Sequence, residues 1–196
     1  MASKLVALTF DESNEFQDDS KQGLNYAFLS GDPEAALLVL KEIEQKAKET
    51  NANLEDAVII YKTGAGEIRI KQTREVTPGK GARRGAFWGM LAGVLFGGPL
   101  VGALWGLGIG AVYGRAVDKG VNEKFIKDVS QAIKPGRSAL LLLIGEEDYD
   151  RAIPYLKTFD TRIYEADLDE SVEEAVEKAV ENPDVAKAAE EEFLGQ

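Results

Sequence analysis

The amino-acid sequence predicts an α+β protein: a ferredoxin-like (split βαβ) domain with an inserted glycine-rich apolar helical hairpin and an acidic helical C-terminal tail. Three observations predict it. Short apolar runs alternate with amphipathic helical patterns along most of the chain. Residues 85–114 carry no charge over 30 positions. Residues 165–196 hold 12 acidic and 2 basic residues, a net charge of −10 out of −11 for the whole chain.

Hydrophobic periodicity and turn residues place the elements of the ferredoxin-like domain. In chain order we expect a strand at 5–10, a helix at 33–51, strands at 57–61 and 68–70, a helix at 122–133, a strand at 138–144, a helix at 148–157 and a strand at 162–164. The first six of these elements match the split βαβ pattern. The first helix begins with Asp32 and Pro33, an N-cap acid followed by proline at the first helical position. The apolar run 138–144 is typical of a strand buried on both faces.

The same patterns divide the chain into three parts. The ferredoxin-like domain takes in residues 1–80 and 120–166, the hairpin 81–119 and the tail 167–196. We expect the helices on one face of the sheet, with the other face left for a partner or for the tail. The tail has a weak apolar stripe that includes Val172 and Val176, and this stripe is expected to pack on the domain or on another subunit.

Glycine recurs at every fourth position in the uncharged segment. The two registers, which meet at a Gly-Gly-Pro turn, are Gly81, Gly85, Gly89, Gly93 and Gly97, and then Gly98, Gly102, Gly106, Gly110 and Gly114. A glycine inside a helix in water costs about 0.5–1 kcal/mol relative to alanine, so such a repeat needs a compensating contact. Stripes of small residues let helix backbones approach closely, as in membrane-embedded helices. These ten glycines are therefore the predicted helix-packing or oligomer contacts.

The flanks of the hairpin predict its orientation. Basic residues lie before and after it, and aromatic residues lie near both ends. The predicted membrane-interface residues are Lys80, Arg83, Arg84, Trp88, Tyr113 and Arg115. Both ends of a hairpin lie on one side, and basic flanks place that side in the cytoplasm. Leu91 and Leu95 are expected to face lipid.

An alternative interpretation keeps the hairpin away from lipid. The same glycine stripes can pack inside a soluble homo-oligomeric assembly, such as a cage, ring or filament, with protein in place of lipid. The location is then cytoplasmic rather than the cytoplasmic face of the inner membrane. In both cases the chain itself is the main partner, and membrane lipid is a second partner in the first case.

Several segments together resemble a known family. They are 4–10, 54–58, 70–73, 85–89, 96–99 and 135–140. The chain resembles a widespread prokaryotic family of small proteins of unknown function, usually described as membrane proteins, over residues 3–166. The acidic segment 11–32 and the tail after 166 depart from it. The resemblance implies a glycine-zipper hairpin inserted in a ferredoxin-like domain, and it implies no catalytic residues.

Composition narrows the function classes. The chain has no cysteine and no histidine, which excludes cysteine proteases, Ser-His-Asp hydrolases and the usual metal hydrolases. The net negative charge argues against nucleic-acid binding. We expect no catalytic residue, metal site or cofactor. The predicted function is a non-enzymatic, self-associating, membrane-associated scaffold or organiser.

Overall fold

The computed structural model describes residues 3–9, 33–72, 80–96, 121–159, 161–168, 170–184 and 187. The chain divides into two compact units, one of residues 3–73 and 131–165 and the other of residues 74–130 and 166–196. The second half of the predicted hairpin lies outside the described residues. So do the predicted site residues Gly97, Gly98, Gly102, Gly106, Gly110, Tyr113, Gly114 and Arg115.

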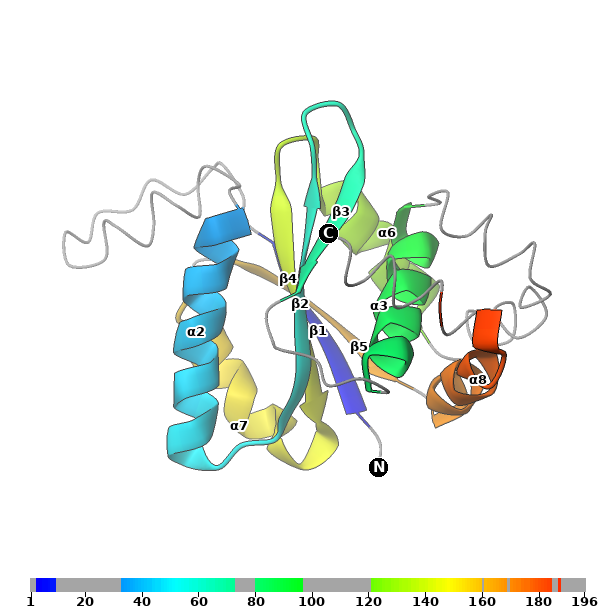
Figure 1. Cartoon of the computed structure of the whole chain (residues 1–196). Helices are drawn as coiled ribbons and strands as arrows, with labels where there is room; N and C mark the ends of the chain where they lie inside the picture. The colour runs from blue at the N-terminus through cyan, green and yellow to red at the C-terminus, as the bar shows by residue number, and fades with distance from the viewer. Residues whose placement is uncertain are drawn as a thin grey trace. The chain divides into compact units, whose positions relative to one another are not determined.

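The first unit is built around a five-stranded antiparallel sheet with the strand order β3-β2-β4-β1-β5 (Figure 1). Its strands are β1 (Ser3–Thr9), β2 (Leu54–Lys62), β3 (Ile68–Gln72), β4 (Ser138–Gly145) and β5 (Arg162–Leu168), and its helices are α2 (Pro33–Thr50) and α7 (Glu146–Leu156). Each element overlaps the one expected at its place in the chain. β5 continues past the expected 162–164 and ends inside the segment assigned to the tail.

Two strand–helix–strand motifs interleave in this sheet. β4 lies between β1 and β2, and β1 lies between β4 and β5. In the chain, α2 comes between β1 and β2, and α7 comes between β4 and β5. β4, from the second of these motifs, therefore lies between the two strands of the first motif, and β1, from the first, lies between the two strands of the second. Figure 1 shows α2 and α7 on the same side of the sheet.

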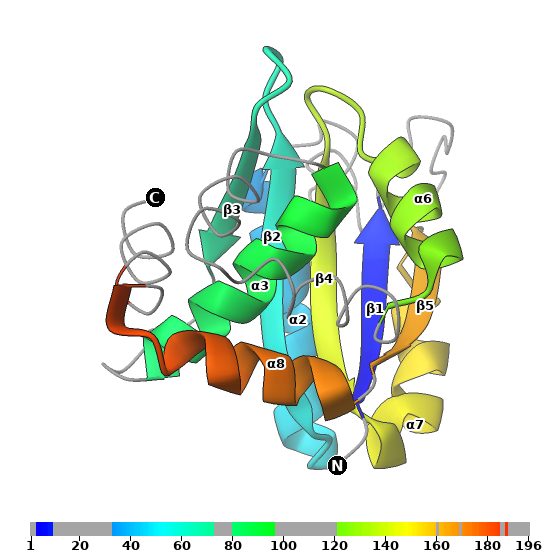
Figure 2. The ribbon, with the colours of Figure 1, turned by 90° about the vertical axis from the view of Figure 1, so that its right-hand side faces the viewer.

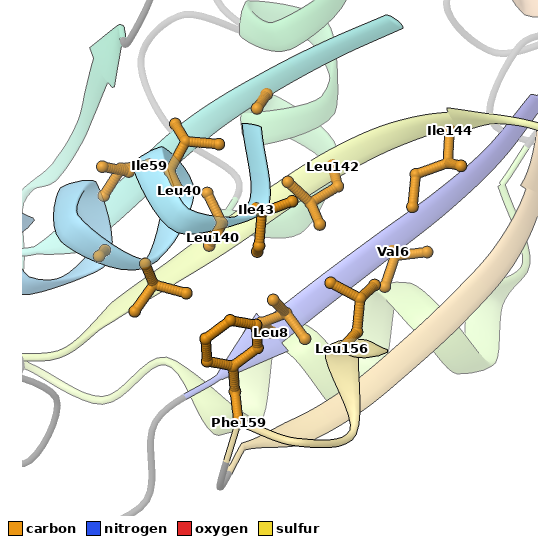
Figure 3. Packing of buried hydrophobic residues seen from close by; sticks show 13 residues of the cluster. Val6, Leu8, Leu40, Ile43, Ile59, Leu140, Leu142, Ile144, Leu156 and Phe159 are labelled. Atoms are coloured by element: carbon orange, nitrogen blue, oxygen red, sulfur yellow. The ribbon is translucent and has the colours of Figure 1, made fainter. Parts of the chain in front are cut away.

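The face that these helices cover carries the main core of the unit (Figure 3). Leu142 lies opposite Val6 of β1 and opposite Ala57 of β2, and all three are fully buried. Leu40 from α2 and Leu156 from α7 belong to the same cluster. Burial of each large aliphatic side chain contributes about 1.5–3 kcal/mol, so this layer is held by side-chain bulk.

The other face of the sheet is apolar and buried as well. Leu5, Val58 and Leu141 alternate with the residues of the main core, and none of them is exposed. The expectation that strand 138–144 is buried on both faces is therefore confirmed. This face was expected to be covered by a partner or by the tail, and its central side chains are buried in the structure.

The second unit contains α3 (Lys80–Phe96), α8 (Glu170–Val180) and most of α6 (Glu123–Ala132). α3 corresponds to the first arm of the predicted hairpin, and α8 to the first part of the tail. Phe125 and Val129 are the buried residues of α6. Within the described ranges, none of the helices combines the length and the apolar character that crossing a membrane requires.

Candidate functional site

The N-terminal end of α3 carries the basic residues that were predicted to meet lipid headgroups. Lys80, Arg83 and Arg84 lie in its first turns, where no acidic residue accompanies them. Positive charge is unfavourable at a helix N-terminus because the macrodipole is positive there. Glu177 of α8 offsets this charge, since its Oε1 lies 2.8 Å from Nη1 of Arg83. Arg84 is half-buried.

The acidic helix α8 lies beside α3 within the second unit (Figure 2). Val172 and Val176, from the predicted apolar stripe, are buried. The stripe was expected to pack on the domain or on another subunit. α8 contacts α3 of the same chain, and the ion pair to Arg83 adds a charge contact between the two helices.

The glycines of the first register lie along α3. Gly81, Gly85, Gly89 and Gly93 recur one turn apart on this helix; Gly85 and Gly93 are buried, and Gly89 is partly exposed. A Cβ atom added at Gly89 would meet no other part of the described chain within 4 Å. Close packing inside the described chain therefore does not explain why position 89 is glycine.

The apolar side chains of α3 are buried. Trp88 is fully buried, and Leu91 and Leu95 are 1% and 4% exposed. The rings of Phe87 and Trp88 meet edge to face with centroids 4.9 Å apart. Leu91 and Leu95 were expected to face lipid and Trp88 to lie at a membrane interface; in the single chain all three are buried. Their burial in the chain removes the same apolar area from water that lipid would.

A pocket of about 200 Å³ lies in the first unit, between α2 and α7. Its polar lining residues are Lys46, Thr50, Asn53, Arg151 and Tyr155, and its apolar ones are Ile43, Ala47, Ala52, Leu54, Ile144, Ala152 and Leu156. Ile43, Ile144 and Leu156 are buried members of the main core, and Figure 3 shows them with that cluster. The pocket is thus an opening into the core layer.

The polar groups around this pocket have partners inside the chain. Lys46 Nζ lies 3.4 Å from Glu49 Oε2, and Arg151 forms an ion pair with the buried Asp148. Tyr155 Oη donates a hydrogen bond of 3.3 Å to Glu42. Burial, and then the negative charges of Glu42 and Glu49, raise the pKa of Tyr155 to about 12.

Sequence reasoning missed this pocket altogether. Its walls come from α2, the connection to β2, the end of β4 and α7, which are far apart in the chain. No spacing motif joins them, and their individual residues are ordinary for helix ends and core positions. Among the described residues, acidic side chains do not cluster in threes that could hold a metal ion.

Comparison with known proteins identifies one family. The DUF1269 family, described as "Protein of unknown function", matches residues 82–181, just over half of the chain. The match starts in α3 and runs through α8, whereas the expected resemblance covered residues 3–166 and left the tail out. No curated protein and no solved structure is significantly similar to the chain. The family match shows that the chain belongs to the DUF1269 family.

Proposed function

We propose that this protein is a non-enzymatic scaffold that associates with itself through the glycine-repeat segment 81–114. One observation supports the proposal above the others: α3 is a continuous helix, and a Cβ at Gly89 would have no atom of another described segment within 4 Å. A helix with bare backbone on one side lets another helix approach closely. The glycine costs helix stability inside the monomer, so a contact beyond it is the reason to keep it.

We further propose that the first unit is a ferredoxin-like domain into which this segment is inserted. The interleaved strand–helix–strand motifs and the central pair β4 and β1 support this assignment. In this interpretation β3 is an extra edge strand, and the chain leaves the domain after β3 and returns through α6. The glycine-repeat segment would then be a large insertion between strands β3 and β4.

We place the self-association at the cytoplasmic face of the inner membrane. The support comes from the sequence: 30 uncharged residues flanked by basic ones suit a hairpin that enters lipid from its cytoplasmic side. The uncharged part of α3, residues 85–96, is about 18 Å long at 1.5 Å per residue, which suits a hairpin that enters one leaflet rather than one that spans the bilayer. Insertion requires Leu91 and Leu95 to exchange their protein surroundings for lipid.

A homo-oligomer that assembles outside the membrane is the second candidate. Burial of Trp88, Leu91 and Leu95 within one chain favours it, because these residues need no lipid to leave water. The ion pair between Arg83 and Glu177 favours it too, since Arg83 already has an anionic partner. Gly85 and Gly93 are already buried in the chain, so other copies would contact α3 at the partly exposed Gly89.

Two measurements on the full-length protein test both candidates. Flotation with vesicles of phosphatidylglycerol and phosphatidylcholine detects lipid attachment, and light scattering gives particle mass. Vesicle-bound oligomers support the membrane scaffold, and large particles that stay unbound support the second candidate. A monomer that stays unbound across micromolar concentrations would contradict both.

Substitutions connect particle size to the glycines. Gly89→Leu combined with Gly106→Leu adds bulk to both glycine registers and should reduce the particles to monomers. Gly64→Leu is the matched control, because a side chain there also meets open space, in the turn between β2 and β3. Particles of wild-type mass in the double variant would contradict the proposed contact through the glycines.

A further inference from the structure

We infer that the pocket between α2 and α7 is a binding site for a small uncharged molecule with an apolar body and a hydroxyl head, such as a short-chain alcohol. The inference is independent of the proposed self-association, because the pocket lies entirely in the first unit. It rests on the pocket's size, on its apolar lining, on the internal pairing of its polar groups and on the way its wall is held open.

Size and lining set the ligand class. The pocket measures about 200 Å³, whereas an engineered apolar cavity of about 150 Å³ holds benzene. Ile43, Ile144 and Leu156 reach it from three different elements and are almost fully buried. A ligand with a compact apolar body would gain the same transfer free energy as a core side chain.

The charges at the rim disfavour a charged ligand. Lys46 and Arg151 carry positive charge, and their partners Glu49 and Asp148 carry negative charge. The Tyr155 hydroxyl is engaged with a further carboxylate, that of Glu42. A cationic head group would lie beside Lys46 and Arg151, and an anionic one would compete with Glu49 and Asp148 for these two cations. An uncharged hydroxyl at the rim breaks no pair.

The wall formed by the α2–β2 connection is fixed in place, so the pocket is formed before any ligand arrives. The Asn53 N–H donates to Asp148 Oδ2 at 2.6 Å, and the Gly145 N–H donates to the Asn53 carbonyl at 3.1 Å. A Cβ at Gly145 would lie 2.8 Å from Glu147 Oε1 and 2.9 Å from Asn53 Nδ2, so the ends of these two side chains lie close against the backbone there. β2 shifts register between Leu54 and Asp56, and such irregularities often occur beside binding sites.

An NMR titration of the ¹⁵N-labelled full chain with 1-octanol tests the inference. We expect saturable shifts at the amides of Ala47, Asn53 and Ala152 and none at Lys178 in α8. Octanoate and octylammonium, with the same chain length, should bind at least about tenfold more weakly, a difference of about 1.4 kcal/mol. Absence of saturable shifts at the lining amides would overturn the site, and equal affinity for octanoate would overturn the uncharged ligand class.

Two neighbouring positions on α2 give a matched pair of variants. Ala47 lines the pocket and Lys48 does not, so Ala47→Leu fills the space while Lys48→Leu adds the same side chain outside it. Ala47→Leu should weaken octanol binding by about tenfold or more, and Lys48→Leu should change it less than about twofold. Ala152→Leu fills the pocket from α7 and serves if Ala47→Leu fails to fold. Unchanged affinity in a folded pocket-filling variant would overturn the assignment.

Discussion

The layer of α2 and α7 and the pair of α3 and α8 differ in how their side chains are packed. In the first, large aliphatic side chains such as Leu40, Leu142 and Leu156 fill one continuous cluster. In the second, α3 carries glycine at every fourth position, and an ion pair between exposed side chains joins it to α8. Side-chain bulk alone packs the first region, whereas the second combines buried bulk such as Trp88 with a helix that carries repeated glycine.

This difference separates folding from assembly. A cluster of buried leucines and isoleucines stabilises the first unit, because each contributes about 1.5–3 kcal/mol. A helix with repeated glycine gives up intrinsic stability and gains only if another backbone comes close. The α2–α7 layer is therefore expected to tolerate little truncation, and the α3–α8 pair to respond weakly when one chain is measured alone.

The largest expected effect is in the first region. Leu142→Ala removes a fully buried side chain between β1 and β2, and should lower the free energy of unfolding by about 3 kcal/mol because a cavity remains. Urea denaturation followed by far-UV circular dichroism measures the change. Leu38→Ala is the control, since Leu38 is 48% exposed, and it should cost less than about 0.5 kcal/mol. Equal losses in both variants would contradict the bulk-packed layer.

Much of that layer could be predicted from the sequence. The proline at 33 and the apolar repeat gave α2, and the uninterrupted run 138–144 gave a strand buried on both faces. Local sequence patterns suffice to predict these elements because each buries an apolar face that its own residues form. The pocket could not be predicted, since Ile43, Ile144 and Leu156 come together only in the folded unit. The contact between Arg83 and Glu177 was also missed, because any of several acidic tail residues could have served.

The second expected effect tests the polar anchor of the first region. Asp148→Asn keeps the shape of a buried side chain but removes the negative charge that pairs with Arg151 and accepts from the Asn53 N–H. The free energy of unfolding should fall by about 1–2 kcal/mol, because a charge-assisted hydrogen bond becomes a neutral one. Asp150→Asn, at an exposed position of the same helix, should change it little. Equal losses would mean that the Asp148 contacts contribute nothing beyond the loss of surface charge.

The third prediction has the opposite sign and belongs to the glycine helix. Gly89→Ala adds a methyl group where nothing lies within 4 Å, so in the isolated chain it should stabilise α3 by about 0.5–1 kcal/mol. Both tryptophans lie in segment 81–114, so tryptophan fluorescence during urea denaturation at low protein concentration reports on that segment. Gly64→Ala, in a turn rather than a helix, should show no such gain. A loss of stability at 89 would show that a neighbour already fills that space.

The smallest expected effect is at the contact between α3 and α8. Arg83 and Glu177 have side chains that are 62% and 55% exposed, so Glu177→Gln should cost no more than about 0.5 kcal/mol at low salt. A double-mutant cycle with Arg83→Gln isolates the pair, and Glu174→Gln is the control at another exposed position of α8. At 1 M salt, where the Debye length is about 3 Å, the coupling should vanish. A coupling that persists at high salt would mean that the charge contact between α3 and α8 is shielded from solvent. The α3–α8 pair would then differ less from the buried α2–α7 layer than the exposed fractions of Arg83 and Glu177 indicate.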